Sequence, residues 1–129
     1  MLDVAVGGGV LMPGHSMTFT VTTEDDFQRL SAVGMLVTTN DAFFGLDSYF
    51  LHDARRNVTF SAPAWDAGSE YNSESCEHIP GPPCGNPFVR VTEEAEGFVH
   101  IHSGIHGDYD LPTQYSWGNG VVIINAKRQ

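Results

Sequence analysis

Basic residues are scarce in this chain. Its 129 residues include six Lys and Arg against sixteen Asp and Glu, and the formal net charge is −10. Nucleic acids and anionic membrane surfaces attract positively charged proteins, so this composition argues against either as a direct partner. The same acidity favours bound cations, because a cation reduces the repulsion between neighbouring carboxylates.

Long apolar runs are also missing. A membrane-spanning helix needs about 18 apolar residues in succession, and the sequence has no such run, so we expect no transmembrane segment. Residues 1–12 contain short apolar stretches without a preceding basic region, which argues against an intact signal peptide. If the protein is exported, we expect that its signal has already been removed.

Cysteine is rare, with Cys76 and Cys84 as the two copies. Three of the seven residues between them are prolines and one is a glycine, so a disulfide would close a tight loop. Two buried thiols are the alternative, but the loop has few apolar residues with which to bury them. A disulfide indicates an oxidising compartment, so we expect a secreted, periplasmic or cell-surface protein.

Helical periodicity is nearly absent, whereas short runs of alternating or continuous apolar residues are frequent. Strands are predicted at residues 17–21, 30–38, 43–50, 57–61, 88–92, 97–102 and 120–125. Residues 63–87 read as a loop, residues 93–96 as a hairpin turn, and residues 24–30 as a possible short helix. Short strands joined by turn residues are typical of a β-sandwich. We therefore predict a single all-β domain over residues 1–129, an antiparallel sandwich with long loops at one end.

Two acidic segments suggest a metal site. NDAFFGLDS at residues 40–48 and WDAGSE at residues 65–70 each place two carboxylates near aromatic residues and a glycine. A buried carboxylate without a partner is costly, so a divalent cation would hold these groups together if the segments meet. Calcium, with its loose coordination by many oxygen atoms, suits such a site better than magnesium. The predicted ligands are Asp41, Asp47, Asp66 and Glu70, although aspartates at such positions also cap turns.

Histidines form a second candidate group. His100 and His102 would project from the same face of a strand, and with His106 they could bind copper or zinc for redox or hydrolytic chemistry. This His-x-His arrangement resembles that of copper/zinc superoxide dismutases and cupins. The alternative is structural: the histidines hydrogen-bond to loop groups, or pack the strand against the loop at residues 76–84 through His78.

Taken together, four motifs resemble the spondin domain, which occurs in F-spondin, in mindin and in many bacterial exported proteins. They are the two acidic segments, IPGP at residues 79–82 and VHIHSGIHG at residues 99–107, and the last two resemble the bacterial branch in particular. The resemblance extends from about Leu11 to Ala126. It implies a β-sandwich similar to a C2 domain, with a calcium ion held by acidic residues at one end of the sheets.

Carried over by position, the resemblance makes Asp47 and Asp66 calcium ligands. Glu70 stands where animal members usually have aspartate, and Asp41 matches the acidic residue that opens the first segment. Animal members act in adhesion, so the resemblance implies an exported, non-enzymatic module that binds a cell-surface, matrix or carbohydrate ligand. The family normally has additional N-terminal strands, and we expect an open sheet edge here that a second copy completes as a homo-oligomer.

Two other hypotheses follow from the residues alone. One is a β-fold metalloprotein or metalloenzyme that binds copper or zinc through His100, His102 and His106. The other is a structural surface protein whose acidic residues keep it soluble.

Overall fold

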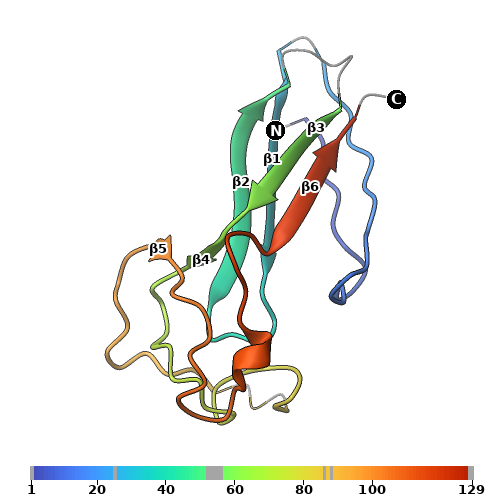
Figure 1. Ribbon diagram of the computed structural model, residues 1–129. Coiled ribbons are helices and arrows are strands. Elements are labelled where there is room, and N and C mark those ends of the chain that lie inside the picture. The colour runs from blue at the N-terminus through green and yellow to red at the C-terminus, as the bar shows by residue number, and fades with distance from the viewer. Residues whose placement is uncertain (1, 25, 52–56, 86, 88, 128–129) are drawn as a thin grey trace.

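The computed structural model describes residues 2–24, 26–51, 57–85, 87 and 89–127 and consists mainly of strands and long loops (Figure 1). The elements in chain order are β1 (Arg29–Met35), β2 (Ala42–Phe50), β3 (Val58–Ala62), β4 (Ala64–Asp66), β5 (His100–Ile101), the 3-10 helix η1 (Thr113–Tyr115) and β6 (Val122–Ala126). All strand pairs are antiparallel, and the predicted all-β class is confirmed. None of the described residues belongs to a helix that could cross a membrane.

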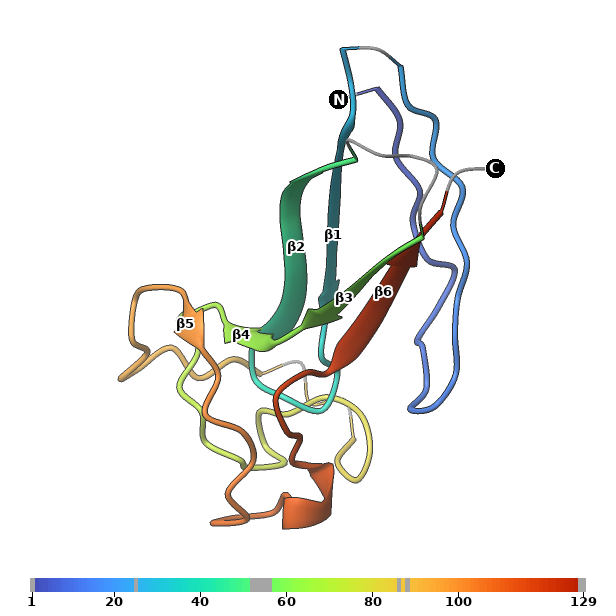
Figure 2. The same cartoon turned by 45° about the horizontal axis from the view of Figure 1, so that its top comes forward.

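The strands form two sheets, one with the order β1-β2-β4-β5 and the other with β3 and β6. The chain changes sheet at Pro63, which separates β3 from β4. Proline has no N–H to give to a strand ladder, so it suits this break between the sheets. Tyr49 of β2 and Phe60 of β3 pack edge to face with ring centroids 4.2 Å apart. The two sheets lie close together where β3 leads into β4 and separate toward their other end (Figure 2), and the sandwich form itself stays a prediction.

The loops between β4 and β6 gather at one end of the strands (Figure 1), and the best-buried apolar cluster lies there. Its centre is Ile79, Ile105 and Leu111, against which Cys84, Tyr115 and Trp117 pack. The predicted disulfide between Cys76 and Cys84 is confirmed, with Cα atoms 5.0 Å apart. It is compatible with the predicted oxidising compartment, while export stays a prediction.

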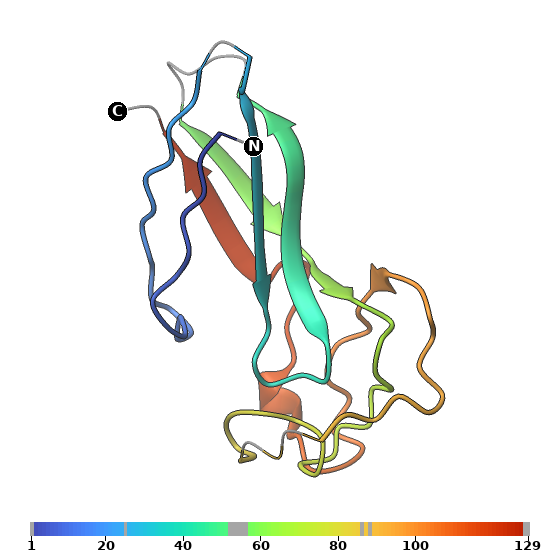
Figure 3. The ribbon, with the colours of Figure 1, turned by 180° about the vertical axis from the view of Figure 1, so that it is seen from behind.

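Several sequence predictions were wrong in detail. Residues 17–21 and the described residues of 88–92 form no strand, and no helix forms among the described residues of 24–30. The range 63–87, interpreted as a loop, contains β4. Residues 2–23 instead run as two extended arms beside β6 (Figure 3). Alternation alone cannot produce a strand, because the backbone must also find a partner to hydrogen-bond with.

Candidate metal centre

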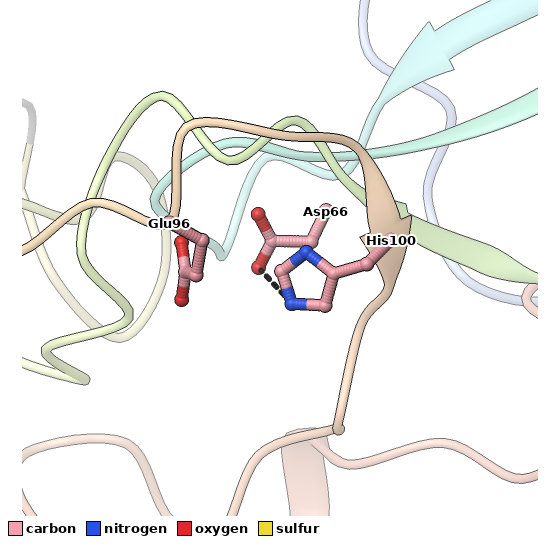
Figure 4. Close-up of side chains that lie close together, drawn as sticks. All are labelled: Asp66, Glu96 and His100. Carbon is pink, nitrogen blue, oxygen red and sulfur yellow. Dashed lines mark ion pairs between the residues drawn. The ribbon is translucent and has the colours of Figure 1, made fainter.

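Three side chains from separate parts of the chain meet beside the short strand pair β4–β5 (Figure 4). Asp66 ends β4 and lies directly opposite His100, which begins β5, and Glu96 comes from the loop before β5. One ligand atom of each residue lies within 4.8 Å of the others. The group of Asp66, Glu96 and His100 could therefore hold a metal ion.

Asp66 is the buried member of this group. Its relative exposure is 0%, and the Gly68 backbone N–H donates to its Oδ1 over 2.7 Å. The Asn72 side-chain amide donates to its Oδ2 over 2.5 Å. A carboxylate oxygen can accept more than one hydrogen bond, so each oxygen keeps capacity for another partner. The Nε2 atom of His100 lies 3.9 Å from Oδ2, on the side where this oxygen can take a further partner.

The hydrogen bond on the other side of the His100 ring determines what Nε2 can do. His100 Nδ1 lies 3.3 Å from the carbonyl oxygen of Phe98, and a carbonyl only accepts, so Nδ1 carries the proton. In the neutral ring the Nε2 lone pair then points toward the carboxylate of Asp66. A second ring N–H bonded to a backbone carbonyl is typical of histidines that bind metals. A proton on Nε2 would make this contact an ion pair with Asp66 (Figure 4), and a metal ion could occupy the same place in the neutral form.

Close contact between two loops brings Glu96 to this place. Gly68 adopts a φ of +64°, and its carbonyl oxygen accepts a hydrogen bond from the Gly97 N–H over 2.9 Å. A Cβ at position 68 would lie 2.2 Å from the carbonyl oxygen of Phe98. Only glycine combines this φ with so close an approach at low cost. Gly68 therefore lets the loop that carries Glu96 lie against the turn that follows Asp66.

The donor set suits a transition metal better than calcium. Zinc binds nitrogen and carboxylate oxygen at about 2.1 Å, which in a tetrahedral site separates the donor atoms by about 3.4 Å. In this structure His100 Nε2 lies 3.9 Å from Asp66 Oδ2 and the three ligand atoms lie within 4.8 Å of one another, so the His100 ring and the exposed Glu96 side chain would both move inward to bind the ion. Imidazole suits zinc, copper, iron and nickel, whereas calcium prefers oxygen donors throughout.

Two of the predicted calcium ligands serve other interactions. The Oδ2 atom of Asp41 accepts hydrogen bonds from the Ser69 N–H, the Ser69 hydroxyl and the Glu70 N–H. Its Oδ1 is buried and has no partner among the described residues. The Oε1 atom of Glu70 lies 2.7 Å from Nε of Arg90. The structure thus brings Asp41 and Glu70 close together, but Arg90 supplies the positive charge beside Glu70.

Asp47 lies apart from the other acidic residues. Asp66 pairs with Ala42 at the start of β2, and Asp47 is five residues further along the same strand. At about 3.3 Å per residue, that places the two backbones roughly 16 Å apart. Asp47 Oδ1 accepts hydrogen bonds from the hydroxyls of Ser31 and Ser48. The structure does not bring Asp47 to Asp66, because a continuous strand keeps its two ends apart.

The predicted three-histidine group is not assembled either. His100 joins the carboxylates, whereas His102 is buried and occupied by other hydrogen bonds. His106 is exposed, and its Nε2 lies 3.1 Å from the Ser103 hydroxyl. His78 Nδ1 is buried without a partner in the described part of the chain. The meeting of buried Asp66 and exposed Glu96 beside His100 could not be read from the His-x-His spacing.

His102 is held as a neutral ring. Its Nδ1 accepts the Gly104 N–H over 3.0 Å, and its Nε2 lies 3.1 Å from the Asn72 side-chain oxygen. Burial lowers the pKa of His102 from its usual 6.5, because it disfavours the charged form, and this outweighs the raising effect of Asp66 and Asp41.

This lowered pKa predicts a loss of stability in mild acid. The unfolded chain binds a proton at His102 more readily than the folded chain does, so the free energy of unfolding should decrease as pH falls below about 6.5. Chemical denaturation at successive pH values, with a chelator present, measures the effect. The slope just below pH 6.5 should persist in His106→Gln, which changes an exposed histidine, and become shallower in His102→Gln. An equal slope in both variants would contradict the prediction.

Sequence reasoning missed two residues of this site. Glu96 was assigned to a hairpin turn, and Asn72 was not noted at all. A signal for Glu96 existed, since it is an acidic residue four positions before a histidine in a glycine-containing loop. Asn72 has no comparable signal, because its role depends on contacts with Asp66 and His102.

Comparison of the chain with protein-family models, with curated proteins and with solved structures gave no match.

Proposed function

We propose that this protein is a metal-binding β domain that holds a divalent transition metal, zinc being the best fit, through Asp66, Glu96 and His100. The observation that carries the proposal is the orientation of His100. Its Nδ1–H is bonded to the Phe98 carbonyl, and its Nε2 faces the buried Asp66 carboxylate at 3.9 Å. Metal-binding histidines are typically oriented in this way by a second hydrogen bond.

A metal ion here would join two segments distant in sequence. Asp66 belongs to the sheet, whereas Glu96 lies in the exposed loop that leads into β5. Three protein ligands leave the fourth tetrahedral position to water or to a group on a bound partner. Such an open position allows a carboxylate or similar anionic group of a partner to bind the metal directly. The proposed function is thus metal binding that stabilises the loop and provides a site for a ligand.

Thermal unfolding with added metal tests the proposal. A ligand that binds the folded state alone stabilises it by about 2.7 kcal/mol at a hundredfold excess over Kd, so zinc should raise Tm by several degrees. His100→Ala and Asp66→Asn should abolish this increase. His106→Ala, which removes an exposed histidine outside the group, should keep it. An unchanged Tm with zinc, cobalt and manganese alike would contradict the proposal.

The calcium-dependent adhesive role implied by the spondin resemblance stays a prediction. Asp41 supplies an observation in its favour, since its buried Oδ1 lacks a partner among the described residues. The same unfolding experiment with calcium separates the two roles. A Tm increase with calcium that is lost in Asp41→Asn but kept in His100→Ala would support the calcium site. An increase that needs His100 would support the transition-metal site.

A further inference from the structure

A chain of hydrogen bonds leads from the interior of the loop region to the proposed metal site. It begins at the Gly104 N–H, continues through His102 and Asn72, and ends at the Asp66 carboxylate. The first member determines the direction of all the others. A backbone N–H can only donate, so His102 Nδ1 accepts and His102 Nε2 carries the proton.

The protonated Nε2 of His102 in turn determines the orientation of Asn72. It donates to the Asn72 side-chain oxygen over 3.1 Å, so the amide nitrogen of Asn72 must point the other way. That nitrogen donates to Asp66 Oδ2, the oxygen that faces His100. The Asp66 carboxylate is thereby held on both sides, since the Gly68 N–H binds Oδ1.

We infer that Asn72 and His102 are positioning residues for the metal site, which hold Asp66 with its Oδ2 toward His100 and the metal. The inference rests on the proposed function, because it concerns the orientation of one of the proposed ligands. Neither residue belongs to the ligand group, and His102 acts on Asp66 through Asn72. Outer partners of this kind fix a ligand before the metal arrives, and their removal weakens metal binding.

Metal titration of variants tests the inference, with zinc for affinity and cobalt(II) for the visible spectrum of the site. Asn72→Ala and His102→Leu should each raise the Kd for zinc by about 10- to 100-fold, with a changed cobalt spectrum. His102→Gln keeps a side-chain N–H that can donate to Asn72, and its Kd should stay within about threefold of the parent. Tyr71→Phe, an exposed neighbour of Asn72, should leave both the Kd and the spectrum unchanged.

The outcomes distinguish this inference from the function on which it rests. If the parent protein binds neither metal, the proposed function and the inference both fail. If the parent binds metal, and Asn72→Ala and His102→Leu bind it with the parent's Kd and cobalt spectrum, only the positioning role is overturned. Equal weakening in His102→Gln and His102→Leu would also overturn the His102 step. Should His102→Leu fail to fold, the zinc Kd and cobalt spectrum of Asn72→Ala, compared with those of the parent, decide whether the residue that binds Asp66 is a positioning residue.

Discussion

Gly68→Ala should lower the free energy of unfolding by about 3 kcal/mol. The left-handed φ of +64° costs an L-residue about 1 to 2 kcal/mol. The added methyl would also lie 2.2 Å from the carbonyl oxygen of Phe98 and 2.7 Å from its nitrogen. Because those atoms are backbone, the loop itself must move, and forced overpacking costs about 1 to 3 kcal/mol more. Urea denaturation of the metal-free protein measures the loss.

The same substitution should also impair metal binding. Gly68 donates to Asp66 and accepts from Gly97, so a displaced loop would move Glu96 and His100 away from Asp66. Gly118→Ala is the matched control, since a Cβ there would meet nothing within 4 Å and its φ is not left-handed. We expect the control to retain both stability and zinc affinity. Equal stability of the two variants would show that residues 68 and 98 are not in close contact.

Glu74→Ala should destabilise the loop end of the protein by about 3 kcal/mol, and lower Tm by about 10 °C. Glu74 is 7% exposed, and its carboxylate accepts three backbone N–H groups, those of His106, Gly107 and Asp108. Hydrogen bonds to a charged group contribute about 1.5 to 3 kcal/mol each, but these three share one carboxylate and residues 106–108 are solvent-exposed. The expected loss of stability is therefore well below the sum of three separate hydrogen-bond contributions.

Two further variants separate the role of the carboxylate from a general effect of charge. Glu74→Gln retains one oxygen acceptor but sets its NH2 group against a backbone N–H, so we expect roughly half the loss. Glu77→Ala removes an exposed acidic residue of the same loop and should change Tm little. Calorimetry provides the comparison. A Tm for Glu74→Ala that matches Glu77→Ala would rule out the proposed anchoring of residues 106–108.

Local chemistry made parts of the fold predictable. Strands β1 and β2 follow from apolar alternation and large side chains, and the disulfide follows from two cysteines in a short proline-rich loop. β4 was missed because three residues carry too little pattern. The run at residues 17–21 was mistaken for a strand because it alternates without a partner. A strand needs hydrogen bonds from another segment, and sequence pattern does not supply that partner.

The acidic residues illustrate the same limit. The two carboxylate-rich segments do meet, since the Asp41 carboxylate accepts hydrogen bonds from the Ser69 and Glu70 backbone N–H groups. The convergence of their four carboxylates on one ion was inferred from residue types, which do not determine how far apart those carboxylates lie in the folded protein. Asp47 lies further along β2, and Arg90 lies beside Glu70, so Asp66 alone of the four predicted ligands reaches the proposed metal site.

The sequence by itself determined the all-β class, the disulfide and the scarcity of positive charge, because each depends on residue types and short spacings. Tertiary structure alone decided which donors meet. Pairing of β4 with β5 sets Asp66 opposite His100, and contact at Gly68 brings in Glu96 from thirty residues further along the chain (96 against 66). Metal ligands need positions accurate to a fraction of an ångström, and only the packing of distant segments provides that accuracy.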